Sequence, residues 1–412
     1  MKAASLFLAL EVMISYTAAH AVTLEMVTVG NPGNAPDTEV MITDLTTGFG
    51  SVGYVYQIGK YEVTAGQYTE FLNAVAKADP HRLYHDLMGD LVGIQRSDSS
   101  PNYSYSVGSN CGDDCASLPV SLVSFWDAAR FANWLHNGQP SGAQGPGTTE
   151  DGAYVNVGNK ATFARQPGAK YFIPSEDEWY KAAYHDQSAG LAASYFDYPT
   201  GTNSQPGNDL TETTKPGNNV NTPFTGEGHP FDRTMVGEFE LSDNPYGTFD
   251  QGGNVWEWNE GLYFSARALR GGSFLTNGIR AFYRTGNDPI FEDLDVGFRI
   301  ATIIPEPSAL LLGALACVGL LVQRRCVTRF AFSRRTAESR DLRDFVPLNF
   351  DASHRRAGAL HALDRGDKGL VQIGGLTVEL EPRDAVARQN ASVGTSRFVQ
   401  LVGVFVRHFG FG

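Results

Sequence analysis

The strongest constraint on the fold of this chain is the amount of sequence that favours loops. Residues 139–158 and 200–228 are rich in Gly, Asn, Pro, Ser and Thr. These residue types favour turns and are poor choices for the interior of helices and strands. A chain interrupted in this way must build its core from a few short elements. The sequence therefore predicts an α+β fold with little regular secondary structure.

Three short helices are predicted outside these stretches. The first begins at Thr64, the second has Ser124 as its N-cap and ends after His136, and the third begins with a capping box of Ser175 and Glu178. Apolar side chains recur at helical spacing in each helix. Short strands are predicted in the segments YVYQIGKYEV, GGSFL and VGFRIAT.

The chain begins with a predicted signal peptide over residues 1–21. Lys2 precedes an apolar run, and Ala19-His20-Ala21 has the small-x-small pattern that signal peptidases cut. A buried N-terminal helix is the alternative. We take the mature chain to start near Val22, which predicts an exported protein.

A second apolar run lies at residues 308–322, after the motif PEP and before Arg324 and Arg325. A spanning helix needs about twenty apolar residues, and the run approaches this length when its flanks are added. Residues 304–330 resemble the PEP-CTERM sorting signal of bacterial surface proteins, which includes a transmembrane segment. A plain C-terminal membrane anchor is the alternative. Both interpretations place residues 22–303 outside the cytoplasm, at the cell surface or beyond it.

The tail, residues 331–412, follows the predicted sorting signal. It carries 12 basic and 9 acidic side chains and has no strong periodicity. A PEP-CTERM signal normally ends the chain close to its arginine cluster. We therefore expect this tail to lie outside the functional domain, as a disordered segment or a read-through product.

The predicted exported part is strongly acidic. Residues 22–303 contain 16 Lys and Arg side chains against 34 Asp and Glu, a net charge of −18, whereas the whole chain has −13. An acidic domain without a basic stripe repels phosphate backbones. The composition therefore argues against nucleic acid as a partner and favours divalent cations.

Four cysteines constrain the redox chemistry. Cys317 and Cys326 belong to the predicted membrane segment and its edge, which leaves Cys111 and Cys115 for the exported domain. In an oxidising compartment, two thiols in a short loop rich in Gly and Asp favour a local disulfide over free thiols. Carboxylates between the two cysteines also oppose thiolate formation.

Six segments occur in an order that resembles one known family. They are IGKYEVTAGQYTEFL, PVSLVSFWDAARFANWL, FIPSEDEWYKAA, DQGGNVWEW, RALRGGSF and VGFRIA. Together they resemble the sulfatase-modifying factor family, whose founding activity is the formylglycine-generating enzyme. The resemblance covers residues 22–303. It implies a fold related to C-type lectins, low in regular structure and held in part by calcium.

The segment GGNVWEWNE, preceded by Asp250, carries the predicted metal site. In an extended segment Trp256 and Trp258 share one face, so the two rings are predicted to lie in the core. Calcium takes six to eight oxygen ligands, and a glycine-rich turn exposes carbonyl groups. The resemblance implies that calcium is held by the side chains of Asp250 and Glu257 and by the carbonyl groups of Gly253 and Val255. A second site would use Asn219, Val220 and Asp232.

The catalytic cysteines of the founding enzyme have no counterpart. That enzyme uses copper(I) held by two cysteines shortly after the GGS element, where this chain has Thr276 and Asn277, and no cysteine lies between Cys115 and Cys317. Copper(I) prefers thiolates to hydroxyl and amide groups, so copper is not expected. Ser273 has no histidine near it in sequence to act as its base. We therefore assign no catalytic residue.

Two other clusters suggest chemistry. His81 and His85, with Asp86 or Asp90, have the spacing of a metal site on a helix, although histidines in a polar loop are more often solvated. The acidic run 176–178 resembles an acid and base pair, but acidic residues at the start of a helix are favoured by the helix dipole.

Three arginines lie among apolar residues of the last strands. They are Arg280, Arg284 and Arg299. We expect internal ion pairs, with an anion-binding role as the alternative.

These observations lead to a functional prediction. We expect an exported, surface-associated module that has lost copper oxidation and that binds a carbohydrate, an extracellular polymer or a surface protein. Its ligand surface would carry aromatic side chains such as Tyr263, Phe264 and Tyr283. The alternative is a divergent oxidoreductase that uses another metal or the pair Cys111 and Cys115. The sequence leaves enzymatic activity, ligand and oligomeric state open.

Overall fold

A computed structural model of the chain describes residues 21–109, 111, 114–214, 217–223, 232–304, 369–373 and 376–380. The chain divides into two units, Met1–Ser308 and Ala309–Gly412. Residues 1–20 of the predicted signal peptide and residues 305–330 of the predicted sorting signal lie outside the described residues. Within the described ranges, no helix is long and apolar enough to cross a membrane.

The helices of the first unit begin where the sequence predicts them. They are α1 (Ala65–Val75), the single turn α2 (Met88–Leu91), α3 (Phe125–His136) and α4 (Glu176–Tyr184), with short 3₁₀ turns at Cys115–Ser117 and Gln187–Ala189. Thr64, Ser124 and Ser175 each close a capping box with the third residue of the helix. Each box satisfies two backbone N–H groups that have no partner inside the helix. The three predicted helices are confirmed.

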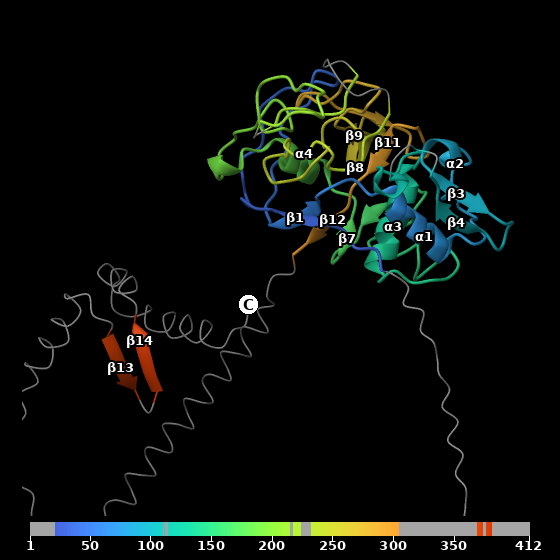
Figure 1. Cartoon of the computed structure of the whole chain (residues 1–412), viewed down its shortest axis with the longest axis horizontal. Helices are drawn as coiled ribbons and strands as arrows, with labels where there is room; N and C mark the ends of the chain where they lie inside the picture. Colours follow the sequence, from blue (N-terminus) through green and yellow to red (C-terminus); the bar gives the residue numbers. More distant parts are fainter. Residues whose placement is uncertain are drawn as a thin grey trace, which may run out of the picture. The chain divides into compact units, whose positions relative to one another are not determined.

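One four-stranded sheet joins the two ends of this unit. Its order is β1 (Met26–Val29), β2 (Tyr56–Gly59), β12 (Ala301–Ile303) and β7 (Tyr171–Phe172), and all pairs are antiparallel. The predicted strand in YVYQIGKYEV therefore exists as β2. Because β12 lies between β2 and β7, this sheet forms only when distant parts of the chain have come together (Figure 1).

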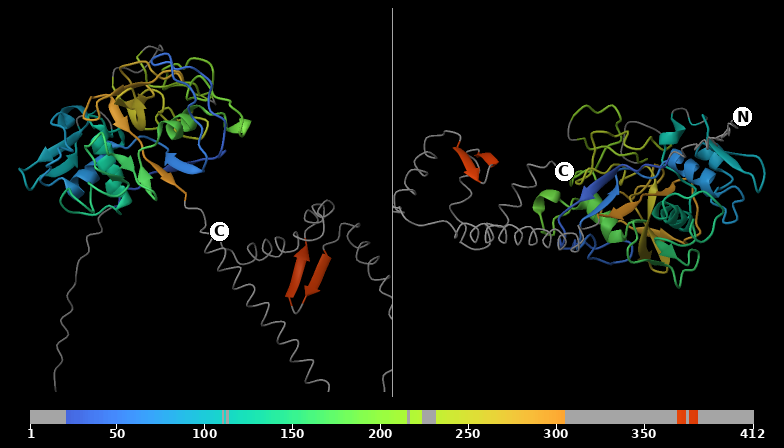
Figure 2. Two further views of the ribbon diagram at one scale, coloured as in Figure 1. Left: turned by 180° about the vertical axis from the view of Figure 1, so that it is seen from behind. Right: turned by 90° about the horizontal axis from the view of Figure 1, so that it is seen from below.

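The second four-stranded sheet carries the tryptophan segment. Its order is β10 (Thr285–Asn287), β9 (Ala266–Arg270), β8 (Trp256–Tyr263) and β11 (Val296–Phe298), and β11 runs parallel to β8. Figure 2 shows this sheet from two further sides. Two small hairpins complete the unit, β3 (Ile94–Ser97) with β4 (Ser104–Val107), and β5 (Tyr154–Val155) with β6 (Ala164–Arg165).

Two strand predictions need correction. The segment GGSFL is not a strand, because Gly271 and Gly272 adopt φ of +96° and +73°, which turns the chain after β9. The segment VGFRIAT is not one strand either. It is divided into β11 and β12, which belong to different sheets.

Aromatic rings connect the elements around the core. Phe131 of α3 lies 5.3 Å from Phe71 of α1 and 5.4 Å from Phe298 of β11, measured between ring centroids. Phe125, at the start of α3, lies 6.1 Å from Trp258 of β8. The described structure therefore has few helices, several small sheets and a main hydrophobic core rich in aromatic rings, which confirms the predicted α+β class with little regular structure.

The second unit is described only in a hairpin. Strands β13 (Gly369–Ile373) and β14 (Leu376–Leu380) pair antiparallel.

Candidate functional site

The turn before β8 depends on an exceptional backbone. Asp250, Gly253 and Asn254 have φ of 60°, 81° and 59°, all in the left-handed region. A Cβ atom at Gly253 would lie 2.3 Å from the carbonyl oxygen of Asn221, and the N–H of Asn254 donates to that oxygen at 3.0 Å. Glycine is required at Gly253 because the loop that contains Asn221 approaches so closely.

The two tryptophans of this segment belong to the core, as predicted. Trp258 is fully buried and donates from Nε1 to the carbonyl oxygen of Val123 at 3.0 Å. Trp256 is also buried and donates from Nε1 to the hydroxyl of Thr276 at 2.6 Å. Each indole N–H thus has a partner, which removes the cost of burying it.

Glu257 lies between the tryptophans and forms a fully buried ion pair. Its carboxylate accepts two hydrogen bonds from Arg299, at 2.5 and 2.6 Å, and a third from Nε1 of Trp179 at 2.8 Å. Both side chains of the ion pair are inaccessible to solvent. The bidentate geometry compensates the desolvation of the two charges.

Two further carboxyl groups are buried beside this pair. Asp250 accepts a hydrogen bond from the N–H of Gly237 at 2.5 Å, and burial raises the pKa of Asp250 to about 6. Burial and the charge of Asp250 also raise the pKa of Glu62. Among the described residues, Oε2 of Glu62 has no hydrogen-bond partner. Three carboxyl groups therefore share the charge of Arg299.

The predicted calcium site can be compared with this arrangement of buried carboxyl groups. Both carboxylate oxygens of Glu257 already accept hydrogen bonds from Arg299. The structure places Asp250, Gly253, Val255 and Glu257, the predicted calcium ligands, in one turn and the strand that follows it. Across the described ranges, no three or more His, Cys, Asp or Glu side chains are grouped so that they could hold a metal ion. A site of two carboxylates and two carbonyl groups is a different arrangement, and it stays a prediction.

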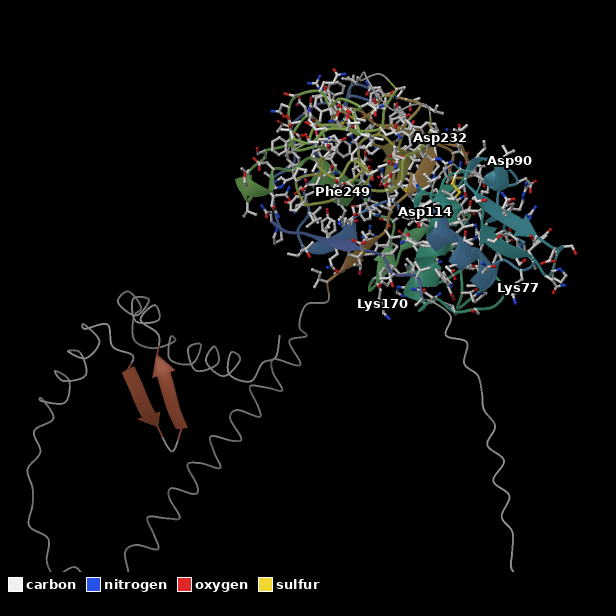
Figure 3. The ribbon with its side chains drawn as sticks, in the orientation of Figure 1. Lys77, Asp90, Asp114, Lys170, Asp232 and Phe249 are labelled. Atoms are coloured by element: carbon white, nitrogen blue, oxygen red, sulfur yellow. A yellow bond between two sulfur atoms is a disulfide. The ribbon has the colours of Figure 1, made fainter. Side chains whose placement is uncertain are left out.

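The residues suggested for a second metal site have other partners. Asn219 accepts a hydrogen bond from the N–H of Asp209 and donates one to Glu212, and Val220 is buried. The carboxylate of Asp232 is largely exposed and contacts Arg233. Figure 3 labels Asp232.

The segment after Gly272, where the family resemblance implies copper ligands, contains a network of hydroxyl groups. The Ser273 hydroxyl donates to the Asp295 carboxylate at 2.6 Å and lies 2.9 Å from the hydroxyl of Thr276. Thr276 in turn accepts from Trp256. These oxygen atoms do not fit copper(I), which requires soft ligands. The partner of Ser273 is a carboxylate, which the sequence analysis did not identify.

The remaining cysteines of this unit are bonded to each other. Cys111 and Cys115 form a disulfide with a Cα–Cα distance of 5.7 Å. The predicted disulfide is confirmed. In this state neither sulfur is a thiolate that could bind a metal.

The structure does not support the alternative of a metal site formed by His81 and His85 on one helical face, because both lie in a loop, as the sequence favours. Both lie before α2, and Arg82 between them has a φ of 58°, which a helix does not allow. Nε2 of His81 is 3.4 Å from Glu150, and Nε2 of His85 is 3.7 Å from Glu292. Each imidazole therefore faces a different carboxylate.

Acidic side chains at the start of α4 form ion pairs with arginines of other segments. Glu176 binds Arg270 at 2.8 Å and Arg284 at 2.5 Å, and Glu178 binds Arg165 at 2.8 Å. The helix dipole therefore explains only part of this acidic run, because the direct partners are arginines, of which Arg270 and Arg284 are buried and Arg165 is partly exposed. The expected internal ion pairs of Arg284 and Arg299 are confirmed.

Arg280 lines a surface cavity of about 210 Å³. Its lining residues are Tyr198, Gln205, Asn277, Gly278, Ile279, Arg280, Phe282 and Tyr283. The guanidinium of Arg280 binds Asp197 at 2.9 Å and lies 4.5 Å from the ring centroid of Phe282. Aromatic rings with a few polar groups are typical of a small-molecule site.

Only one of the three aromatic residues suggested for the ligand surface lines this cavity. Tyr283 does, whereas Tyr263 and Phe264 lie at the end of the β8–β9 hairpin and contact each other. The contribution of Tyr198 was missed, because the chain brings it from a loop that carries no local signal of ligand binding.

The chain matches the family described as the sulfatase-modifying factor enzyme 1-like domain over residues 51–304. It is 29% identical over 210 residues to the inactive C-alpha-formylglycine-generating enzyme 2 of Mus musculus, and the match covers 46% of this chain and 60% of that protein. A crystal structure of CarF is similar at a TM-score of 0.46 and 20% identity, over 69% of this chain and 99% of that one. PvdO from Pseudomonas aeruginosa is similar at a TM-score of 0.40 and 18% identity, over 68% and 94%.

Proposed function

The chain belongs to the sulfatase-modifying factor enzyme 1-like family, and from this premise we propose that it is a non-catalytic module of the formylglycine-generating type that binds carbohydrate. The observation that carries this proposal is that Thr276 and Asn277 stand where the family resemblance implies copper-binding cysteines, beside a cavity with aromatic walls. The mouse relative that the chain resembles is itself named inactive.

The absence of the family reaction is supported by the chemistry of the hydroxyl groups. Thr276 already accepts a hydrogen bond from Trp256, and Ser273 already donates one to Asp295. Neither group can replace a thiolate as a copper(I) ligand. The serine also has a carboxylate rather than an imidazole as its partner, so it lacks the base that usually activates a serine nucleophile.

Carbohydrate binding is supported by the lining of the cavity. The rings of Tyr198, Phe282 and Tyr283 offer flat apolar surfaces on which the apolar face of a sugar ring can stack. The amides of Gln205 and Asn277 can bind hydroxyl groups at the edges of that ring. The cavity volume of about 210 Å³ lies below the usual range of drug-sized ligand sites and therefore limits the bound part of a polymer to about one sugar unit.

Calcium is proposed as a structural ion of the same domain. Asp250 and Glu257 would hold it with their carboxylates, and Gly253 and Val255 with their carbonyl groups. Calcium would contribute positive charge to a turn in which Arg299 is the cation that faces three buried carboxyl groups.

Export and anchoring are proposed from the sequence. The signal peptide at residues 1–21 and the PEP-CTERM-like segment at residues 304–330 would bring residues 22–303 to the cell surface, through the membrane and its sorting machinery. Cell fractionation tests this, because the full chain should be found with membranes or outside the cell. Recovery in the cytoplasm alone would reject it.

The carbohydrate proposal is tested by glycan binding to the purified chain. We expect binding to neutral extracellular polysaccharide and a loss of about tenfold in affinity for Tyr283→Ala, because one stacking surface is removed. Phe264→Ala is the matched control, since that ring is exposed and lies outside the cavity.

Two outcomes would contradict the proposal. Equal glycan affinity of the Tyr283→Ala and Phe264→Ala variants would show that the glycan does not bind in the cavity. An aldehyde formed in a cysteine-containing peptide, with copper and a reductant present, would instead support the oxidoreductase alternative. The variants Cys111→Ser and Cys115→Ser would then show whether that pair supplies the thiolates.

A further inference from the structure

A cluster of exposed apolar side chains lies at the tips of two loops. It consists of Val40, Ile42 and Leu45 from the loop before β2, and Leu262 and Phe264 from the end of the β8–β9 hairpin. All are more than half exposed, and Leu45 and Phe264 reach 78% and 74%. We call these five residues the apolar tip surface. Single exposed apolar residues are common, but a group gathered on neighbouring loops marks an interaction site.

Hydrogen bonds fix the two loops against each other. The hydroxyl of Tyr263 donates to the carbonyl oxygen of Thr43 at 3.4 Å. Arg284 donates to the carboxylate of Asp44 in one loop and to the carbonyl oxygen of Leu262 in the other, the latter at 2.7 Å. Arg284 also donates two hydrogen bonds to the carboxylate of Glu176. The apolar tip surface is therefore built on a buried ion pair.

The backbone at both tips is unfavourable for the residues that occupy it. Leu45 has a φ of 62° and Phe264 a φ of 54°, where glycine or asparagine would cost less. Exposure and backbone strain both act against these side chains in the isolated domain. Strained residues of this kind gather at ligand clamps and similar functional sites.

The border of this surface is acidic. Glu39 precedes Val40, and the carboxylates of Asp37 and Asp197 lie close enough to Glu39 for their charges to act on it. The nearby cation, Arg280, is already paired with Asp197. Residues 22–303 carry a net charge of −18. A second copy of the chain or an anionic lipid surface would therefore be repelled.

We propose that the apolar tip surface docks a protein segment whose apolar side chains are flanked by lysine and arginine. The apolar residues of that segment would cover Leu45 and Phe264, and its basic residues would face Glu39 and its acidic neighbours. This site adjoins the aromatic cavity, because the N–H of Ile42 donates to the carbonyl oxygen of Phe282 at 3.2 Å, but none of its five residues lines that cavity. The proposed docking does not depend on carbohydrate binding. It adds a protein partner of defined chemistry to the proposed function.

The test selects peptides from a random phage library on the purified chain. We expect the recovered peptides to combine apolar residues with Lys and Arg. A synthetic peptide of the consensus sequence should lose about tenfold in affinity for each of Leu45→Ser and Phe264→Ser. Ile290→Ser is the matched control, because Ile290 is 69% exposed but belongs to another loop, and it should bind like the wild type.

Four results would overturn the proposal. The first is a failure to recover peptides, or recovery of peptides without basic residues. The second is equal affinity of the consensus peptide for the tip variants and the control. The third is binding to phosphatidylcholine vesicles that Leu45→Ser and Phe264→Ser abolish, which would identify lipid as the occupant. The fourth is self-association that the same variants abolish, which would identify a second copy. Tyr283→Ala should not change peptide affinity, so the carbohydrate proposal is tested separately.

Discussion

At the scale of single residues, buried arginines organise this domain. Arg270, Arg284 and Arg299 are almost inaccessible to solvent, and each binds a glutamate of another element. Because a buried charge without a partner is costly, these contacts select one arrangement of the elements that carry them. Arg299, which lies between β11 and β12, is the clearest case.

Removing Arg299 should destabilise the domain strongly. Arg299→Met would leave Glu257 buried without its partner and close to two other carboxyl groups, so we expect a loss of about 3–5 kcal/mol in the free energy of unfolding. Lys160→Met is the matched control. It breaks the pair with Asp288, whose side chains are 52% and 47% exposed, and should cost less than about 1 kcal/mol. Urea unfolding measures both, and similar losses would refute the role of burial.

The sequence singled out some of the buried acidic residues in this region but not others. Asp250 and Glu257 were found because they occur in one segment that resembles a known family. Glu62 and Asp295 were missed, because each is an isolated acid in sequence. Their importance depends on burial beside Asp250 and on contact with Ser273, and both contacts join distant segments.

At the scale of elements, the sequence predicted where helices begin but not which strands pair with each other. In the capping boxes that begin at Ser124 and Ser175, the two members of each box are three residues apart in sequence, so the helix starts could be predicted. The division of VGFRIAT between two sheets could not, because strand pairing is set by partners far away in sequence. The aromatic cavity was missed for the same reason.

Two carboxyl groups near the start of α3 should make the stability of the domain depend on pH. Burial raises the pKa of Asp127 to about 6, and burial together with the charge of Asp127 raises the pKa of Glu292 to about 8. Asp79, Arg82 and Arg130 act on these two groups, and His85 lies 3.7 Å from Glu292. Two carboxyl groups therefore face each other where the loop before β11 contacts α3.

The stability of the domain should fall as pH rises through this range. The ordinary pKa of Glu292 is 4.5, so between 4.5 and about 8 the folded chain holds a proton that the unfolded chain has released. Raising the pH therefore lowers the free energy of unfolding. Above about pH 8, Glu292 is ionised in the folded chain as well, and the free energy of unfolding no longer changes through this group. Glu292→Gln cannot ionise and should remove most of this slope between about pH 6 and 8, as measured by urea unfolding. Below about pH 6, the raised pKa values of Asp127 and Asp250 contribute a slope of the same sign.

Asp288→Asn is the control for this prediction. Asp288 lies in the same loop, and its hydrogen bond with Lys160 lowers its pKa below the ordinary value. Since Asp288 is already ionised throughout the range, its substitution should leave the slope unchanged. A slope that persists in Glu292→Gln would show that other groups cause it.

At the scale of the whole first unit, the ion pair between Glu257 and Arg299 connects the two four-stranded sheets. Glu257 lies in β8, and Arg299 follows β11 and precedes β12, which pairs with β2 and β7. Arg299 also donates to the carbonyl oxygens of Gly59 and Phe249. A change of charge in the turn around Asp250 should therefore affect the stability of both sheets together.

Calcium should stabilise the whole domain through this turn. The carboxyl groups of Glu62, Asp250 and Glu257 exceed the charge of Arg299, so loss of the ion would leave repulsion in a buried site. At a concentration one hundred times its dissociation constant, calcium would add about 2.7 kcal/mol. We expect a chelator to lower the melting temperature and calcium to restore it, and Asp250→Asn to remove most of this response. Asp232→Asn, at an exposed carboxylate, should respond like the wild type. A melting temperature that calcium and chelator leave unchanged would show that Arg299 alone balances the carboxyl groups, with the unpaired oxygen of Glu62 protonated.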